Sequence, residues 1–153
     1  MNFKLLDLSD IEIAEELWAL QHAAYRREAE LIGVADLPPL RDTVQSLQQC
    51  GETFYGAVAD DGTLAGAVSV EEESDGRRVV CRLMVHPEHF RQGIGGSLLR
   101  HAISEAPDRV WNVTAEARNE PALRLYERAG FRSVGSFRPA PNIEMIQLQL
   151  ERN

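Results

Sequence analysis

The glycine-rich segment at residues 93–96 separates two apolar patterns of different period. Residues 78–85 before it are rich in valine and predict a strand, whereas residues 94–103 repeat at helical spacing. A second strand-like run follows at residues 110–115. A strand, a helix and a strand joined by short connections form a crossover unit, so the two strands are expected to be parallel neighbours in one sheet.

The chain before the glycine segment predicts antiparallel strands. Strand-like runs at residues 53–59 and 64–70 flank Asp60-Asp61-Gly62, and an Asp-Gly pair is a strong signal for a hairpin turn. The remaining elements, in chain order, are a strand at residues 3–6, helices at 11–29 and 43–49, a helix capped by Asn119 that ends before Gly130, and strands at 132–137 and 143–150. We therefore expect an α/β-type (α+β) fold with a mixed sheet, antiparallel N-terminal strands and flanking helices.

Length and composition narrow the classes of protein that this chain can be. Its 153 residues suit one domain, residues 1–153, and its net charge of -8 argues against binding to a nucleic-acid phosphate backbone. No apolar run reaches the roughly 20 residues of a membrane helix, and acidic side chains stand where a secretory signal needs an apolar stretch. Cys50 and Cys81 lie far apart in the sequence and form no Cys-x-x-Cys motif, which favours two reduced thiols over a disulfide. We expect a cytoplasmic protein without a nucleic-acid or membrane partner.

The glycine segment has two interpretations. The first N–H groups of a helix have no partner within it, and the positive end of the helix dipole lies beside them, so a glycine-rich strand-to-helix loop suits a phosphate. Arg91 adds a positive charge next to this loop. Alternatively, the glycines only let the helix pack closely on the sheet. The loop lacks the Lys-Ser/Thr pair of a P-loop, and its place after several antiparallel strands weighs against a dinucleotide fold.

Two blocks of sequence resemble one known family. Residues 91–95, Arg-Gln-Gly-Ile-Gly, followed by Ser-Leu-Leu at 97–99, are similar to the acyl-CoA pyrophosphate loop of the GNAT acetyltransferase superfamily. The block from Asn119 to Phe131 resembles that family's N-x-x-A-x-x-L-Y-x-x-x-G-F signature. The order and separation of the blocks also match, and the resemblance covers the chain from the first hairpin onward. One departure is Phe90, which stands where the family often has Arg or Gln.

The resemblance implies a site for an acyl-CoA. In similar proteins the two central parallel strands splay apart, and the pantetheine arm lies between them. Backbone groups of Leu83 and Val85 would then contact the pantetheine, and the side chain of Asn119 would touch the cofactor. The pyrophosphate would be bound by the N–H groups of Arg91, Gln92, Gly93, Gly95, Gly96 and Ser97.

The same resemblance places the hydroxyl group of Tyr126 near the thioester sulfur. A hydroxyl there can protonate the departing thiolate as a general acid. Asn119 and Tyr126 are two helical turns apart, so they project from the same side of one helix. Taken without the resemblance, Asn119 is a helix cap and Tyr126 an amphipathic core residue.

A general base is predicted from the acidic residues at strand ends. The acidic run at residues 71–73 ends one strand, and Glu116 ends another. A solvated turn is the alternative interpretation of the run. Glu72 is favoured as the base because strand alternation puts it on the same face as Val70. The histidines match no zinc spacing, so we expect no metal.

These observations together predict an acetyl-CoA-dependent N-acetyltransferase. A primary amine would attack the thioester directly, without an acyl-enzyme. The acceptor would be a small-molecule or peptide amine, and residues 22–47, which carry charges of both signs, would build part of its site. The alternatives are a catalytically weak CoA-binding or protein-binding module with the same fold, favoured by Phe90, and an acyltransferase for a longer acyl group. A homodimer through the C-terminal strands is a further open alternative.

Overall fold

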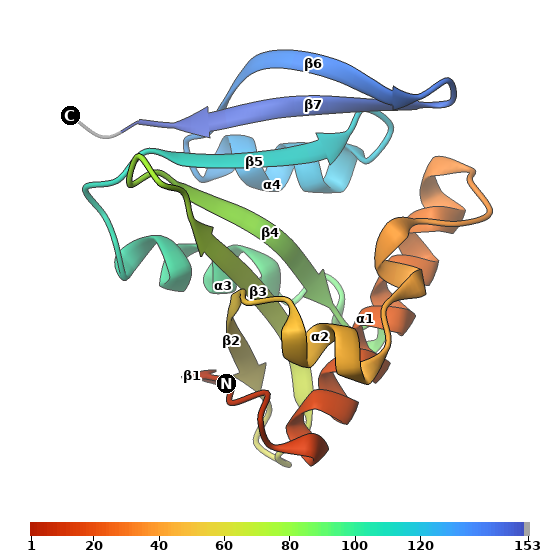
Figure 1. Ribbon diagram of the computed structural model, residues 1–153, viewed down its shortest axis with the longest axis vertical. Helices are drawn as coiled ribbons and strands as arrows, with labels where there is room; N and C mark the ends of the chain where they lie inside the picture. Colours follow the sequence, from red (N-terminus) through yellow and green to blue (C-terminus); the bar gives the residue numbers. More distant parts are fainter. Residues whose placement is uncertain (152–153) are drawn as a thin grey trace.

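The computed structural model describes residues 1–151, which form a seven-stranded mixed sheet with helices on both faces (Figure 1). The strands lie in the order β1-β2-β3-β4-β5-β7-β6. Their bounds are β1 Asn2–Leu5, β2 Thr53–Val58, β3 Leu64–Glu72, β4 Arg78–Val85, β5 Trp111–Glu116, β6 Arg132–Ala140 and β7 Ile143–Leu150. The helices are α1 Ile11–Ile32, α2 Val44–Gln49, α3 Ile94–Ser104 and α4 Glu120–Arg128, with short 3-10 turns η1 Pro38–Arg41 and η2 Pro87–His89. The predicted fold class is confirmed.

Local signals in the sequence explain where the helices begin and end. Asp10 caps α1 by accepting a hydrogen bond from the backbone N–H of Glu12, and Gly33 ends this helix in the left-handed region at a φ of 77°. Asn119 caps α4 as predicted. No helix within residues 1–151 has the length and apolar character needed to cross a membrane.

The crossover unit produces the predicted parallel pair, but the two strands separate almost at once. β4 pairs with β5 at Arg78 and Val79, and no further pairing between them occurs in the described chain. On its other edge, β4 pairs with β3 from Arg78 to Val85. β4 therefore follows β3 away from β5, and the divergence is visible in Figure 1. The C-terminal end of β4, which leads into the loop before α3, therefore has one edge without a strand partner.

Two apolar layers hold the helices on the sheet. On one face, α3 and α4 pack through Leu98, Leu99 and Tyr126 around the fully buried Trp111. On the other face, α1 and α2 pack against β2, β3 and β4; the buried side chains of this layer are Leu6, Leu17, Leu20, Leu47, Phe54, Leu64, Ala67 and Met84. Burial of one large apolar side chain contributes about 1.5 to 3 kcal/mol, so these layers fix both helix pairs relative to the sheet.

A sheltered ionic network fixes the position of α1. Arg82 on β4 donates hydrogen bonds to Asp42 at 2.7 Å and to both carboxylate oxygens of Glu52 at 3.0 Å. Gln21, which is 1% exposed on α1, donates to Asp42 and accepts from Arg82. The indole N–H of Trp18 donates to the carbonyl of Asp42 at 2.7 Å. The network ties α1 to β4, and the C-terminal half of α1 consequently lies beside the free end of that strand.

Candidate active site

A cleft of about 780 Å³ lies at the end of β4, where β4 and β5 have separated. Its walls come from α1, the end of β4, the start of α3 and the start and far end of α4. The residues that line it are Ala24, Tyr25, Arg27, Glu28, Leu31, Leu83, Met84, Val85, His89, Phe90, Arg91, Gly93, Ile94, Gly95, Gly96, Arg100, Asn119, Pro121, Ala122, Leu125, Arg128 and Ala129. The structure thus brings the glycine loop, the end of β4 and the capping asparagine into one cavity.

The glycine loop forms the start of α3 by an unusual backbone path. Gly93 has a φ of 75° at the cap of α3 and Arg91 a φ of 65°, so two residues of the loop lie in the left-handed region. No side chain caps this helix. Its first N–H groups are therefore available to a ligand. A Cβ at Gly93 would meet no atom within 4 Å, whereas one at Gly95 would lie 3.0 Å from Leu125. Gly95 thus serves helix packing, and Gly93 serves the turn.

The charge around the cleft is opposite to that of the chain as a whole. Four arginines line the cleft, namely Arg27, Arg91, Arg100 and Arg128, and Glu28 is the single acidic residue among the lining residues. Arg27 lies 3.6 Å from Glu30, whereas the other three have no carboxylate within 4.0 Å in the described chain. A protein with a net charge of -8 has therefore concentrated cations around one cavity.

The other predicted cofactor contacts lie in or beside this cleft. Leu83 and Val85 line it from the unpaired end of β4. Gln92 belongs to the loop and Ser97 to the first turn of α3, and neither is among the lining residues. Gln92 lies 3.4 Å from a ring nitrogen of His89. Ser97 accepts a hydrogen bond from Arg100 at 3.2 Å, and its backbone N–H, which was expected to bind the pyrophosphate, donates to the carbonyl of Gly93 at 3.1 Å within the helix. Phe90 lines the cleft with 43% of its surface exposed.

The side chain of Asn119 makes two contacts within the protein. Its Oδ1 accepts a hydrogen bond from the N–H of Ala122 at 3.3 Å, which is the helix-cap role that the sequence also allowed. Its Nδ2 donates to Oε1 of Glu28 at 2.9 Å and so joins α4 to α1 across 91 residues of sequence. Asn119 is 8% exposed, and these two contacts engage both ends of its amide.

Tyr126, on α4, is not among the residues that line the cleft, and it is 6% exposed. Its ring packs edge-on against Phe131, with centroids 5.8 Å apart. Burial, and then the charge of Glu28, raise the pKa of Tyr126 well above that of free tyrosine, so its hydroxyl stays protonated at neutral pH. Among the described residues, the Nε atom of Arg78 is the fully buried side-chain polar atom that has no hydrogen-bond partner. The Tyr126 hydroxyl also makes no hydrogen bond to the described residues.

The structure does not bring Glu72 to the cleft. Alternation places Glu72 on the face of Val70 as expected, but that face is covered by α3, and Glu72 contacts Arg109 in the segment that follows the C-terminus of α3. Its carboxylate lies 3.1 Å from Arg109, which follows the C-terminus of α3, and 3.8 Å from Arg78. One length of this helix, about 16 Å, therefore separates Glu72 from the glycine loop.

Glu116 is placed nearer the cleft but is bound tightly within the protein. Its carboxylate accepts hydrogen bonds from the backbone and the guanidinium of Arg118 and from the backbone N–H of Glu144. The Arg118 side chain, followed by these backbone donors, lowers the pKa of Glu116 to about 2. A carboxylate with so low a pKa is a weak base at neutral pH.

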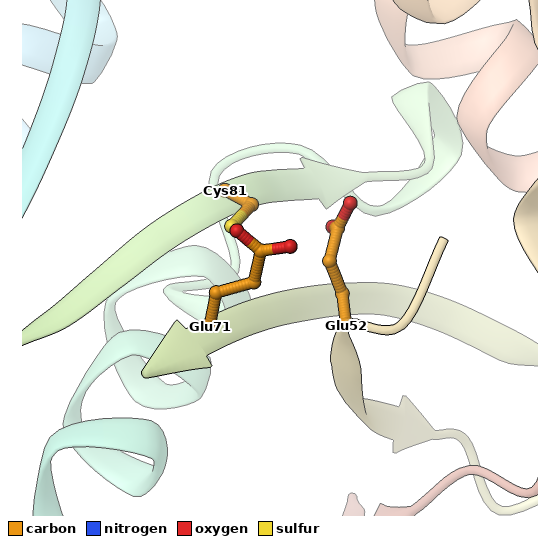
Figure 2. A group of neighbouring side chains, drawn as sticks. All are labelled: Glu52, Glu71 and Cys81. Atoms are coloured by element: carbon orange, nitrogen blue, oxygen red, sulfur yellow. The ribbon is translucent and has the colours of Figure 1, made fainter. Parts of the chain in front are cut away.

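A further group of side chains lies on the face that α1 covers. Figure 2 shows Glu52, from the segment before β2, Glu71, from β3, and Cys81, from β4, converging on one point, and their ligand atoms lie within 4.8 Å of one another. Glu52 is already engaged by Arg82 and by the hydroxyl of Ser69. Burial raises the pKa of the Cys81 thiol to about 12, so this sulfur is protonated at neutral pH. A protonated thiol is both a poor metal ligand and a poor nucleophile.

Sequence reasoning did not single out Glu28. The sequence predicts that residues 22–47 build part of the acceptor site, but the mixture of charges there gives no reason to choose one of them. Two of the cleft arginines, Arg100 and Arg128, were missed for the same reason, since each stands among other charged residues on a helix surface.

Comparisons with known proteins agree with this geometry. The model of the "Acetyltransferase (GNAT) family" matches residues 12–131. The chain is 37% identical to UPF0157 protein YqkA of Bacillus subtilis over 92% of this chain, although it spans only 40% of YqkA. It is 32% identical to Acetyltransferase Atu2258 of Agrobacterium fabrum, with 95% of each chain covered.

Solved structures share the fold at lower identity. The ribosomal-protein-S18-alanine N-acetyltransferase of Escherichia coli matches with a TM-score of 0.76 and 19% identity, covering 97% of this chain and 92% of that one. The structure of yncA from Salmonella typhimurium, described as holding its cofactor acetyl-CoA, matches with a TM-score of 0.72 and 19% identity over 99% and 93% of the two chains.

Proposed function

This chain belongs to the GNAT acetyltransferase family, and on that basis we propose that it transfers an acetyl group from acetyl-CoA to a primary amine. The observation that carries the proposal is the cleft at the start of α3, which is lined by four arginines and by the uncapped N-terminus of the helix. Such a site suits the pyrophosphate and phosphate groups of a CoA thioester. The cited relatives that are named acetyltransferases support the same donor.

The residues that line the cleft fit such a donor along its length. The segment from Arg91 to Gly96, which includes Gln92, presents backbone N–H groups for the pyrophosphate, whereas the N–H of Ser97 is bonded to the carbonyl of Gly93. Leu83 and Val85 offer the backbone groups of an unpaired strand edge to the two amides of a pantetheine arm. When bound, acetyl-CoA supplies the thioester carbon that the amine attacks.

Tyr126 is proposed as the general acid. Its hydroxyl is protonated at neutral pH and lacks a hydrogen-bond partner within the described chain, so it is free to donate to a departing thiolate. Direct attack by the amine is favoured over an acyl-enzyme because the raised pKa of Cys81 makes its thiol a poor nucleophile.

Phe90 favours a second candidate function, a CoA-binding module of the same fold with little catalysis. Its exposed ring stands in the cleft where the family often has Arg or Gln. Both candidates require acetyl-CoA to bind, and only the enzyme requires transfer.

Calorimetric titration of the purified protein with acetyl-CoA, with NADH as the control ligand, tests the shared part of both candidates. Thiol release with a panel of primary amines then separates them. Saturable acetyl-CoA binding with amine-dependent thiol release supports the transferase. Binding without thiol release supports the module. Failure to bind acetyl-CoA contradicts both.

A further inference from the structure

Glu28 is the only sheltered carboxylate of the described chain without a cationic partner. Within residues 1–151, five Asp and Glu residues are buried or half-buried. Glu28 is one of them, and the other four each pair with an arginine: Asp42, Glu52, Glu116 and Glu144. Glu28 has no Arg, Lys or His nitrogen within 4.0 Å in this part of the chain. An unpaired charge in a sheltered position costs stability, and such groups cluster at functional sites.

The position of Glu28 is set by Asn119. The amide of Asn119 donates to Oε1 of Glu28 at 2.9 Å while its own oxygen caps α4. The second carboxylate oxygen, Oε2, accepts no hydrogen bond from the described residues. Glu28 is therefore held on the cleft wall with one oxygen free.

The groups around Glu28 come from three elements. Tyr25 precedes it by one turn on α1, Tyr126 belongs to α4, and Glu116 belongs to β5; the charge of Glu28 acts on both tyrosines, and that of Glu116 acts on Glu28. Burial, assisted by Glu116 and opposed by the Asn119 hydrogen bond, raises the pKa of Glu28 above its ordinary value. A carboxylate with a raised pKa is a stronger base.

We propose that Glu28 binds the ammonium group of the acceptor and takes its proton, and that Asn119 is the positioning residue that holds Glu28 for this role. The inference rests on the proposed function and deepens it, because it names the acceptor as an amine that is protonated in solution. The four arginines of the cleft would repel such a cation, whereas the free oxygen of Glu28 is the one negative position in the lining. A neutral acceptor would leave that carboxylate uncompensated.

The proton balance of the transfer is simple. The ammonium gives one proton to the Glu28 carboxylate and becomes a neutral amine, whose lone pair forms the new C–N bond to the thioester carbon. The C–S bond breaks with its electron pair on sulfur. Tyr126 gives its proton to that sulfur and regains one from the nitrogen of the new amide. Glu28 then releases its proton to solvent.

Three variants separate the catalytic role of Glu28 from the effect of its charge on α1 and from its structural contact with Asn119. Glu28→Gln keeps the shape and an oxygen that can accept from Asn119. Its matched control, Glu30→Gln, removes the same charge from the exposed side of α1. Asn119→Ser tests positioning, because serine still caps a helix but is too short to reach Glu28.

The experiment uses spermidine and L-alaninamide as acceptor probes. Acetyl-CoA affinity is measured by calorimetry, amine affinity by calorimetry on the CoA-saturated protein, and transfer by thiol release. We expect Glu28→Gln to keep acetyl-CoA affinity within about twofold and to lower kcat/KM for the amine by about 100-fold or more at pH 7. The loss should narrow as the pH rises toward the pKa of the amine, because the amine then loses its proton to solvent. Asn119→Ser should show a smaller loss in kcat/KM, and Glu30→Gln none.

The outcomes distinguish this inference from the proposed function. Wild-type protein that binds acetyl-CoA and an amine but transfers no acetyl group contradicts the transferase; in that case, loss of amine binding in Glu28→Gln alone still supports Glu28 as the ammonium site. Equal behaviour of Glu28→Gln and Glu30→Gln overturns the inference. So does wild-type protein whose CoA complex binds neither amine, or a Glu28→Gln variant that loses acetyl-CoA affinity instead.

Discussion

The substitution Glu116→Gln probes the connection that places both Asn119 and Tyr126. Glu116 ends β5, and its two carboxylate oxygens accept hydrogen bonds from Arg118 and from the backbone of Glu144 on β7. A glutamine would turn an N–H₂ group toward one of these donors, which leaves that donor unsatisfied. The turn between β5 and α4 should therefore loosen.

The size of the effect follows from the pKa of Glu116. A shift from the ordinary value of 4.5 to about 2 corresponds to roughly 3 kcal/mol of stabilisation at neutral pH. The Arg118 side chain is 46% exposed, so solvent screening reduces the expected loss to about 2 kcal/mol. The pKa is lowered in the folded state, so the stabilisation is complete above pH 4.5 and disappears as the pH falls toward about 2.

Urea unfolding of wild type and variant from pH 7 down to pH 2 measures this difference. Glu144→Gln is the control, because that side chain is 37% exposed and pairs with an Arg138 that is 63% exposed. We expect this control to lose less than about 0.5 kcal/mol. Two results would refute the reasoning. One is a loss of unfolding free energy below about 1 kcal/mol in Glu116→Gln at pH 7, and the other is a loss at pH 2 that is as large as the loss at pH 7.

Three further predictions concern the cleft and its support. Tyr126→Phe should lower kcat by about 100-fold while acetyl-CoA affinity stays the same; an unchanged kcat in steady-state kinetics removes the general-acid role. Gly93→Val should weaken acetyl-CoA binding in calorimetry by at least about tenfold, whereas Gly62→Val, which meets similar strain at a φ of 88° in a distant hairpin, should leave the affinity unchanged. Arg82→Leu should cost about 3 to 5 kcal/mol in urea unfolding because it leaves two sheltered carboxylates unpaired, and equal losses in Arg82→Leu and in the exposed control Arg41→Leu would contradict that view.

Local pattern alone was enough to predict the order and type of the elements. The hairpin at Asp60-Asp61-Gly62, the cap at Asn119 and the glycine segment are short-range signals, because each depends on the conformations of a few adjacent residues. The parallel pairing of β4 and β5 follows from the handedness and length of a single crossover. The motif blocks around Gly93 and Tyr126 likewise directed the prediction toward an acyl-CoA site, and the loop and the strand end do meet in one cleft.

The chemistry of the cleft was decided by contacts between distant segments. Strand alternation placed Glu72 on the correct face, but only the packing of α3 shows that this face lies a helix length from the glycine loop. No local pattern indicates that Glu28 meets Asn119, because the contact spans 91 residues and depends on the Arg82 network that ties α1 to β4. Periodicity encodes which face a residue occupies, whereas which faces meet depends on how whole elements pack. The sequence by itself therefore determined the elements and the glycine loop, and the tertiary structure alone decided which carboxylate faces the cleft.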